Sequence, residues 1–445
     1  MELVERYQNV GVIGAAGKMG SGIALLLCQQ MALRKLGPDG KDRRFKLTLM
    51  DVNDAGLDGL RAYLSAQLVK LAEKQTVSLR GVYADRADLV ENAEIIQAFV
   101  NDALGVIRMT TDLGALEDCH MIFEAIAENI DLKTSVYGKL KEMCGPETFF
   151  FTNTSSIPIG LLDKEVGLGG RIIGYHFYNP PAVQKLLELI TSSETRPDLI
   201  EMSKQIAKDL RKKVIPANDI AGFIGNGHFM RDGLHGIAET EGLAGEYGFP
   251  EAVYMVNRVS QDWLIRPMGI FQLIDYVGID VFQCILGVMN RFIEGEDLHS
   301  DLVDSLIAKG VRGGQNPDGS QKDGFFHYEK GRPAAVYNLE TGEYVALDAS
   351  WTTKPDSVLG STPEGHAPWR ALLMDAGKEK KLAAYFGNLK KDEQRGAQLA
   401  RAYVKRSKEI GELLVSSGVA ASADDVNGVL MNGFFHLYGP VNDYV

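Results

Sequence analysis

The stretch that decides the fold is VGVIGAAGKMGSGIA, residues 10–24. Residues 10–13 form a short apolar run, which predicts a buried strand, and a helix-like stretch follows from about residue 21 to residue 36. Glycines stand between them. A glycine loop in this position lets the backbone approach a pyrophosphate, whose charge then faces the helix N-terminus. The stretch predicts a nucleotide-binding βα turn, with cofactor contacts from Gly14, Gly17, Lys18, Met19 and Gly20.

The spacing of these glycines differs slightly from the usual fingerprint. Gly14, Gly17 and Gly20 read G-x-x-G-x-x-G, one residue longer than G-x-G-x-x-G. Glycine is needed wherever a Cβ would block the turn or the ligand. A plain tight turn against a closely packed helix explains the same residues, and this alternative stays open.

Asp51 ends a second predicted strand, FKLTLMD. A carboxylate at this position can accept both hydroxyls of an adenosine ribose and would repel a 2′-phosphate. No Arg or Lys follows within the next few residues. Asp51 therefore favours NAD over NADP, although a strand-end carboxylate without a ligand is an open alternative.

The order of predicted elements sets the fold class. Apolar strand-like runs alternate with helical segments up to about residue 215, which is typical of a parallel, doubly wound sheet. Beyond this point the pattern is mostly helical, with one aromatic patch that suggests a small hairpin. We expect an α/β Rossmann-like fold followed by all-α C-terminal domains. The expected domains are 1–216, which binds NAD, 217–345, a helical substrate or dimerisation domain with the hairpin, and 346–445, a linker and a shortened second helical module.

Composition excludes several function classes. The chain of 445 residues has a formal net charge of −12, which disfavours nucleic-acid and anionic-membrane partners. The longest apolar stretch is far too short to span a membrane, and the start lacks the pattern of a secretory signal. The four cysteines have no metal-ligand spacing, so we expect reduced thiols, no metal site and a cytoplasmic location.

The stretch GYHFYNPPAVQKLLELI, residues 174–190, carries a candidate acid/base. Glu188 stands inside an apolar run, where a carboxylate is costly unless it is paired. His176 is its natural partner, because an ionised Glu188 would fix the imidazole tautomer and leave the other ring nitrogen to move a proton. A purely structural His–Glu pair is the open alternative.

A cluster of small polar residues, NTSS, follows the aromatic run at the end of a predicted strand in FTNTSSIPIG, residues 151–160. Its hydroxyls are placed either to meet a substrate and a cofactor or to satisfy the backbone at a strand end. Together with the glycine loop and the His–Glu pair, they suggest alcohol–ketone redox chemistry with a nicotinamide cofactor.

The chain resembles the 3-hydroxyacyl-CoA dehydrogenases from about residue 9 to residue 281. The motifs that carry the resemblance are GKMGSGIA, IFEAIAENIDLK, NTSS, GYHFYNPPAVQKLLELI, DIAGFIGN and RPMGIFQLIDYVG. The resemblance implies an NAD-dependent oxidoreductase of fatty acid metabolism that interconverts a 3-hydroxyacyl-CoA and a 3-oxoacyl-CoA. It also implies a homodimer, or a monomer in which a duplicated C-terminal module replaces the partner.

The resemblance also assigns residue roles. His176 would be the acid/base and Glu188 would orient it, while Ser155 and Asn226 would act beside them on the substrate. The other implied contacts are Glu128, Lys133, Ser155 and Asn179 with the cofactor, and Lys74 with CoA. Plain readings remain open for several of these residues: Lys74 and Lys133 as solvated helix charges, and Asn226 as a helix cap.

The chain also departs from the family pattern. Gly227 stands where the family usually has Arg, Ile270 replaces a customary proline, and Gln67 replaces a CoA-contacting serine. Two alternative functions therefore stay open. One is an NAD-dependent dehydrogenase of a free 3-hydroxy acid, such as a sugar acid or a carnitine-like substrate. The other is a non-catalytic nucleotide-binding structural protein.

Overall fold

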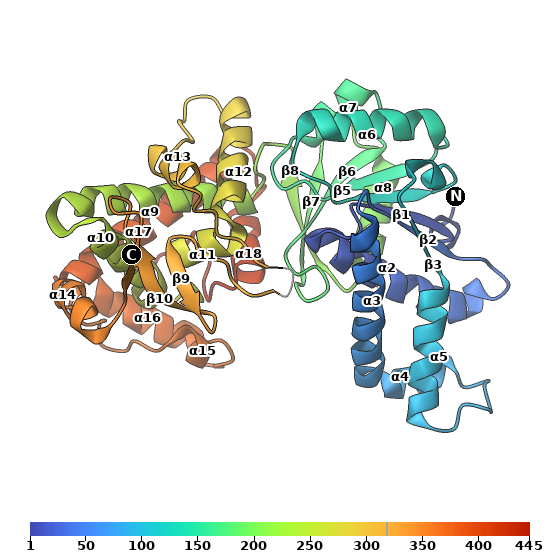
Figure 1. Cartoon of the computed structure of the whole chain (residues 1–445), viewed down its shortest axis with the longest axis horizontal. Coiled ribbons are helices and arrows are strands. Elements are labelled where there is room, and N and C mark those ends of the chain that lie inside the picture. Colours follow the sequence, from blue (N-terminus) through green and yellow to red (C-terminus); the bar gives the residue numbers. More distant parts are fainter. Residues whose placement is uncertain (317–318) are drawn as a thin grey trace. The chain divides into compact units, whose positions relative to one another are not determined.

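The computed structural model describes residues 1–316 and 319–445. The chain forms two compact units, Met1–Asp219 and Ile220–Val445 (Figure 1). The predicted change of texture near residue 215 lies just before this division. The finer division of the second unit at residue 345 remains a proposal.

The first unit is built on an eight-stranded sheet with the order β3-β2-β1-β4-β5-β6-β7-β8. All neighbouring strands are parallel except the antiparallel pair β6 and β7. The predicted doubly wound sheet is therefore confirmed. Its strands are β1 (Asn9–Ile13), β2 (Lys46–Met50), β3 (Ile107–Thr110), β4 (Met121–Glu124), β5 (Phe149–Thr152), β6 (Ile172–Phe177), β7 (Leu186–Thr191) and β8 (Lys213–Asn218).

Helices cover both faces of this sheet (Figure 1). The aromatic run of β5 shows the alternation, because Phe149 and Phe151 join the core beneath α2, α3, α5 and α8, whereas Phe150 packs edge-on against Tyr137 of α6. The α-helices are α1 (Leu3–Arg6), α2 (Lys18–Leu36), α3 (Asp54–Lys74), α4 (Thr76–Val82), α5 (Asn92–Gly105), α6 (Ile130–Met143), α7 (Ile159–Val166) and α8 (Pro197–Asp209). Two short 3-10 helices, Pro38–Gly40 and Leu113–Leu116, complete the unit.

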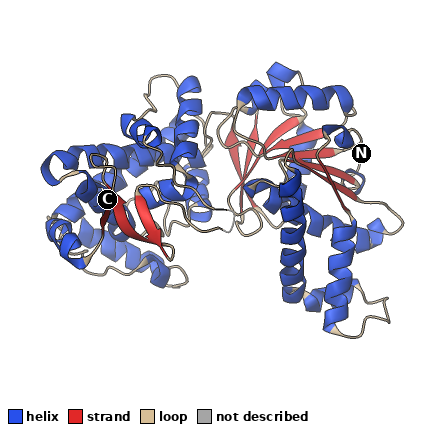
Figure 2. Cartoon of the chain, viewed as in Figure 1, coloured by secondary structure: helices blue, strands red, loops and turns tan. Residues whose placement is uncertain are grey.

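The second unit is mainly helical (Figure 2). The predicted aromatic hairpin is present as a three-stranded antiparallel sheet of β9 (Phe326–Glu329), β10 (Arg332–Tyr337) and β11 (Tyr344–Ala346). The helices are α9 (Gly225–Tyr247), α10 (Phe249–Arg258), α11 (Ile270–Val277), α12 (Ile279–Phe292), α13 (Asp301–Ala308), α14 (Ala349–Leu359), α15 (Trp369–Leu372), α16 (Lys378–Leu389), α17 (Arg395–Ser416) and α18 (Ala423–Gly433), with a π-helix at Val259–Trp263.

One hydrophobic core runs through the second unit, from Ala221 to Leu437. Helices α9, α10 and α12 share it with α16 and α17, so the C-terminal helices pack into the same core as the first ones. No structure was predicted from the sequence for residues 350–390, and the helices α14 to α16 fall in this region. These helices belong to the same core through Leu359, Leu382 and Phe386.

No single described helix is long and apolar enough to cross a membrane. One bent pair of helices, Ile270–Val277 and Ile279–Phe292, is long and apolar enough when the two are taken together, by length and composition alone. The angle between these two helices is 91°.

Candidate active site

The glycine loop joins β1 to α2 and leaves no room for side chains at two positions. Gly14 has a φ of +73°, and a Cβ there would lie 2.5 Å from the carbonyl oxygen of Ala125. A Cβ on Gly20 would overlap the carbonyl oxygen of Gly14. Gly17 is the N-cap of α2, and it offers no capping side chain. The N–H groups of the first helical turn therefore suit an anionic ligand such as the pyrophosphate of a dinucleotide.

Asp51 fastens the end of β2 to this loop. Its carboxylate accepts hydrogen bonds from the backbone N–H of Ala16 at 2.9 Å and of Asn53 at 3.1 Å. Lys18 and Met19 begin α2, and burial lowers the pKa of the Lys18 ammonium. The structure thus brings the predicted pyrophosphate and ribose groups together, while their contacts with a cofactor remain predictions.

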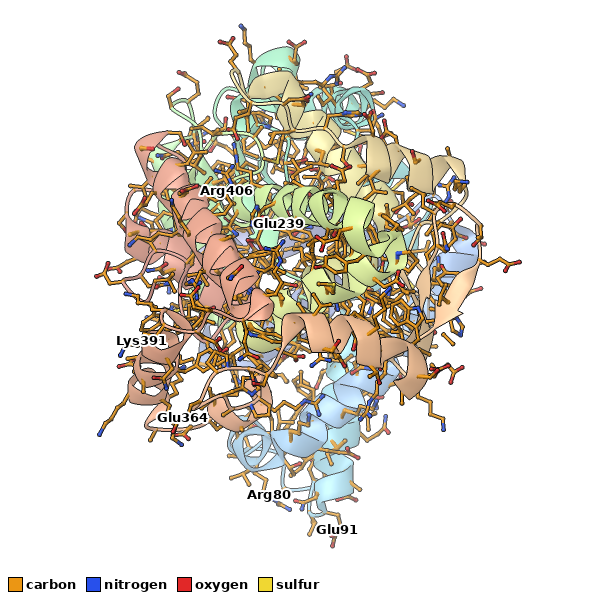
Figure 3. All side chains as sticks on the ribbon, turned by 90° about the vertical axis from the view of Figure 1, so that its left-hand side faces the viewer. Arg80, Glu91, Glu239, Glu364, Lys391 and Arg406 are labelled. Atoms are coloured by element: carbon orange, nitrogen blue, oxygen red, sulfur yellow. The ribbon has the colours of Figure 1, made fainter. Side chains whose placement is uncertain are left out.

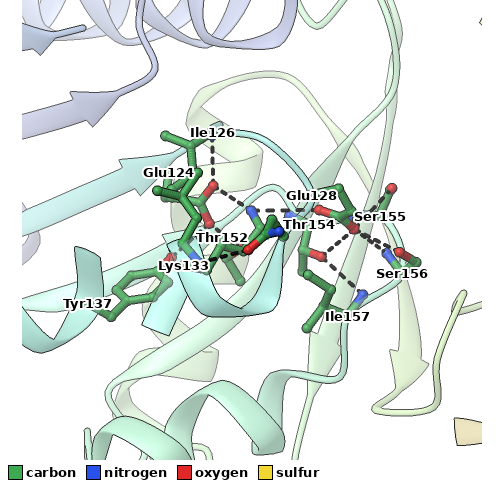
Figure 4. Close-up of polar contacts among 12 residues, drawn as sticks. Glu124, Ile126, Glu128, Lys133, Tyr137, Thr152, Thr154, Ser155, Ser156 and Ile157 are labelled. Atoms are coloured by element: carbon green, nitrogen blue, oxygen red, sulfur yellow. Dashed lines mark hydrogen bonds and ion pairs between the residues drawn. The ribbon is translucent and has the colours of Figure 1, made fainter. Parts of the chain in front are cut away.

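Glu128 collects the hydroxyl groups at the end of β5 (Figure 4). One carboxylate oxygen, Oε1, accepts hydrogen bonds from the backbone N–H groups of Ser155 and Ser156, each at 2.9 Å. The same oxygen accepts from the hydroxyls of Thr154 at 2.7 Å, Ser156 at 2.8 Å and Ser155 at 3.3 Å. In this structure the small polar residues after β5 therefore hold a carboxylate that comes from the loop between β4 and α6.

A second carboxylate, Glu124, lies beneath this cluster and was missed by the sequence reasoning. It ends β4, is fully buried, and accepts hydrogen bonds from Lys133 at 2.6 Å, Thr152 at 2.7 Å and Tyr137 at 3.1 Å. The signal was present in HMIFEAIA, where a carboxylate stands in an apolar strand just as Glu188 does.

Lys133 connects the two carboxylates. Its ammonium lies 2.6 Å from Glu124 and 3.7 Å from Glu128, and its side chain is only 1% exposed, so the reading of Lys133 as a solvated helix charge is wrong. Burial by itself would raise the pKa of Glu128, but the Lys133 charge and the hydroxyl and amide donors outweigh it and lower that pKa. Glu128 is thus held as an ionised group. Direct contact of Lys133 with a cofactor remains a prediction.

His176 and Glu188 face each other across β6 and β7. The antiparallel register pairs them directly, and His176 Nδ1 lies 2.8 Å from Glu188 Oε2. The same oxygen accepts a hydrogen bond from the hydroxyl of Tyr178 at 2.7 Å, a partner that the sequence reasoning missed. Burial and the neighbouring Glu188 carboxylate raise the pKa of Tyr178 well above its usual value. A carboxylate at Nδ1 favours the tautomer in which this nitrogen donates the hydrogen bond.

Asn153 connects the hydroxyl-rich stretch to the histidine strand. Its side-chain oxygen accepts a hydrogen bond from the backbone N–H of Phe177, the residue after His176, at 2.8 Å. Because β4, β5 and β6 are parallel neighbours, their carboxyl ends lie at one edge of the sheet. That edge therefore carries Glu128, Ser155 and His176 together.

Comparisons with known proteins agree with this geometry. Residues 9–220 match the model of the 3-hydroxyacyl-CoA dehydrogenase NAD binding domain, and residues 251–323 match the C-terminal domain of the same family. A probable 3-hydroxybutyryl-CoA dehydrogenase of Deinococcus radiodurans is 30% identical over 315 residues, 70% of this chain and 99% of that protein. The chain belongs to the 3-hydroxyacyl-CoA dehydrogenase family.

Other relatives extend this result. A probable 3-hydroxybutyryl-CoA dehydrogenase of Bacillus subtilis is 29% identical over 332 residues, 72% of this chain and 97% of that protein. The crystal structure of 3-hydroxybutyryl-CoA dehydrogenase from Escherichia coli matches 98% of this chain and 90% of its own with a TM-score of 0.62 and 20% identity, which shows a shared fold. This member of the 3-hydroxyacyl-CoA dehydrogenase family is an NAD-dependent oxidoreductase. The glycine cradle, which a Cβ would fill, fits that cofactor.

Two departures from the family pattern have structural reasons in the second unit. A Cβ on Gly227 would lie 2.9 Å from Leu414 Cδ2, so the missing side chain lets α17 pack against α9. The backbone N–H of Ile270 donates a hydrogen bond to the hydroxyl of Ser260 at 2.9 Å, a bond that proline cannot make. In this family member both residues thus take part in the packing of the second unit.

The remaining predicted contact residues lie in different parts of the chain. Asn179 follows β6, whereas Lys74 is the exposed last residue of α3, a helix that also carries the half-buried Gln67. Asn226 is the second residue of α9 in the second unit. Their contacts with substrate or cofactor remain predictions.

Proposed function

We propose that this chain interconverts a 3-hydroxyacyl-CoA and a 3-oxoacyl-CoA, with His176 as the acid/base and Glu188 as the residue that orients it. The observation that carries the proposal is the 2.8 Å contact between His176 Nδ1 and the fully buried Glu188 carboxylate at the sheet edge that also carries Ser155. The names of the relatives support the acyl-CoA substrate class.

This geometry indicates where the proton goes during the proposed reaction. NAD, when bound, supplies the hydride acceptor for the oxidation. Glu188 keeps Nδ1 of His176 protonated, so Nε2 accepts the proton of the substrate hydroxyl and returns it in the reverse direction. The buried carboxylate also balances the charge that the imidazole gains.

Ser155 and Asn226 would fix the substrate oxygen. The Ser155 hydroxyl donates to Glu128 at 3.3 Å, which orients its oxygen to accept a hydrogen bond from a substrate hydroxyl. Asn226 would supply an amide donor to the carbonyl, and Lys74 would contact the CoA portion. Holding the substrate at two points sets the carbinol against the acid/base.

The test follows the fall in NADH absorbance with acetoacetyl-CoA, free acetoacetate and 3-dehydro sugar acids as parallel substrates. We expect turnover of the thioester and a loss of about 10²–10⁴-fold in kcat for His176→Ala, because proton transfer by a positioned side chain contributes that much. His299→Ala, which changes an exposed histidine of the second unit, is the matched control.

Two results would overturn parts of this proposal. Turnover of the free acids alone would keep the acid/base and reject the CoA ester as substrate. Full activity of His176→Ala would reject the acid/base itself.

A further inference from the structure

A large cavity lies entirely within the second unit. Its volume is about 1440 Å³, and all its lining residues fall between residues 254 and 370. None of them belongs to Met1–Asp219, which carries the glycine loop and His176. Small-molecule sites usually measure about 300–1,000 Å³, so this cavity has room for a ligand of nucleotide size or larger.

The cavity lining is positively charged. Two carboxylates line it, Asp262 and Asp356, and both already bind Arg258, at 2.6 Å and 2.9 Å. The cationic lining residues outnumber them and are Arg258, Arg266, Lys330, Arg332 and Arg370, of which Arg266 is paired with the buried Asp232 at 2.7 Å. In a chain with a net charge of −12, such a local excess of positive charge selects anions.

Three of these cations stand at the exposed rim. Lys330, Arg332 and Arg370 are exposed, and none has an ion-pair partner among the described residues. Lys330 and Gly331 form the turn between β9 and β10, with φ values of +50° and +75°. This two-residue turn sets the backbone position of Lys330 and of Arg332, which begins β10. The rim thus presents exposed cationic donors to an anionic group.

Flat aromatic side chains form the walls, and hydrogen bonds hold them in place. The Trp369 indole donates to the carbonyl oxygen of Phe435 at 2.8 Å, and the Tyr254 hydroxyl donates to Asp356 at 3.1 Å. Tyr328 donates to the buried Asp275 at 2.9 Å. Aromatic rings that do not have to be ordered on binding give a stacking surface at little entropic cost.

The backbone of one wall is irregular. The π-helix Val259–Trp263 contributes Gln261 and Asp262 to the lining, and Ile265, which also lines the cavity, has a φ of +50°. A β-branched residue in the left-handed region is strained, and π-helical turns are frequent at functional sites. The surrounding packing therefore holds this wall in a shape that the local sequence does not favour.

We propose that this cavity binds a nucleotide-like organic anion, with a planar ring between the aromatic side chains and phosphate groups on the rim cations Lys330, Arg332 and Arg370. Charge, flat walls and volume together favour this ligand class over a small inorganic anion or an uncharged lipid. The ligand could come from free adenosine nucleotides or from the 3′-phospho-ADP portion of CoA. The site is additional to the proposed dehydrogenase reaction and does not depend on it.

The tryptophans offer a readout that reports on this unit alone. The chain has three, Trp263, Trp351 and Trp369, and all lie in the second unit. Titration of the full chain with ADP, and separately with CoA, should change tryptophan fluorescence with a saturable curve. Trp369→Phe should remove most of that change. Binding of the same molecules to the first unit lacks such a reporter.

Charge reversal tests the rim. Arg332→Glu with Arg370→Glu should weaken the titration at least about tenfold, because charge-assisted hydrogen bonds to phosphate are lost. The matched control is Lys380→Glu with Lys391→Glu, two exposed lysines of the same unit outside the lining, of which Lys391 lies at the surface in Figure 3. The control should bind as the unchanged chain does.

Each outcome decides the proposal. Saturation by ADP and CoA supports a general nucleotide site, and saturation by CoA alone supports CoA as the source. The proposal is overturned by three results: no saturable change with either ligand at millimolar concentrations, equal binding by the rim variant and its control, or a response to adipate or inorganic phosphate without a response to nucleotides. The His176→Ala turnover assay is separate, so failure of the cavity leaves the proposed reaction untouched.

Discussion

Tyr178 adds a third member to the pair of His176 and Glu188. Its hydroxyl and His176 Nδ1 both use the same oxygen of Glu188, at 2.7 Å and 2.8 Å. The carboxylate is therefore held from two sides. The tyrosine hydroxyl acts on the imidazole through Glu188, and the tyrosine ring also packs against the imidazole, with ring centroids 4.8 Å apart. Tyr178 is a positioning residue for the proposed reaction.

We predict that Tyr178→Phe lowers kcat about tenfold and leaves KM nearly unchanged, since a hydrogen bond to a charged group contributes about 1.5–3 kcal/mol, of which only part reaches the imidazole. Steady-state kinetics with NADH and acetoacetyl-CoA measure both constants. Tyr175→Phe is the matched control, because Tyr175 lies on β6, just before Tyr178 in the chain, and donates to the Ser203 carbonyl instead. A rise in KM alone would show that Tyr178 touches substrate.

The site residues differ in how far the sequence determines them. Glu188 was predictable because a carboxylate in an apolar run needs a partner, and His176 was the available one. The same reasoning applied to Glu124 would have found the pair with Lys133. The role of Glu128 as acceptor for three consecutive residues was not predictable, because it depends on how the loop after β4 folds over the end of β5.

At the scale of elements, α9 and α17 meet at a position without a side chain. Gly227 faces Leu414, and buried polar contacts continue along the two helices: Tyr403 donates to the carbonyl oxygen of Asp232 at 2.9 Å, and His228 lies 3.1 Å from the Ser407 hydroxyl. The close approach of the helices is thus a property of the α9 sequence.

We predict that Gly227→Arg, which introduces the usual family residue, lowers the free energy of unfolding of the second unit by about 1–3 kcal/mol. The reason is that the new side chain overpacks against Leu414. Tryptophan fluorescence during urea unfolding reports this, since all tryptophans lie in that unit. Adding Leu414→Ala should recover part of the loss, and no recovery would mean that the two residues are not in contact.

Asp275 fastens α11 to β9. It is fully buried and accepts hydrogen bonds from the backbone N–H groups of Phe325 at 2.7 Å and Phe326 at 3.0 Å, and from the Tyr328 hydroxyl. Burial, opposed by these donors and reinforced by the nearby Asp323 charge, raises its pKa from 3.8 to about 7. The folded chain therefore keeps a proton that the unfolded chain loses.

The sign of the pH effect follows. Between pH 3.8 and about 7 the unfolded state binds fewer protons at this group, so stability falls as the pH rises through that window, by up to about 4 kcal/mol in total. Asp275→Asn should flatten the decline between pH 3.8 and about pH 7, measured by urea unfolding. Asp301→Asn, a fully exposed control, should keep the decline of the unchanged chain. Identical slopes for all three proteins would refute the assignment.

Elements were predictable where local patterns suffice. The predicted strand-like runs 10–13, 45–51, 148–154 and 171–178 overlap β1, β2, β5 and β6, because buried parallel strands are apolar in themselves. The helices α14 to α16 were not predicted. They combine few apolar residues with Pro355 inside a helix, and they gain their stability from the shared core rather than from local periodicity.

For the whole molecule, the C-terminal helices occupy the face of α9 with residues of the same chain. The family resemblance implied either a homodimer or a monomer in which a second module replaces the partner. Because α17 packs on α9 and buries this face with residues of the same chain, we propose that the chain is the monomer.

We predict that sedimentation equilibrium gives the mass of one chain across a wide range of concentrations. Gly227→Arg disturbs the contact between α9 and α17 and exposes apolar surface of α9. We expect this variant to associate into larger species. A tight dimer of the unchanged chain would contradict the replacement of the partner.

The contacts between α9 and α17 also have a consequence for synthesis on the ribosome. The bonds from Tyr403 to Asp232 and from Ser407 to His228 join residues separated by 171 and 179 positions. The first unit is complete once residue 219 has emerged, but α9 must wait for almost the entire remaining chain. During that interval its buried polar groups lack partners, so nascent chains stalled before residue 395 should need chaperone protection that chains stalled near residue 219 do not.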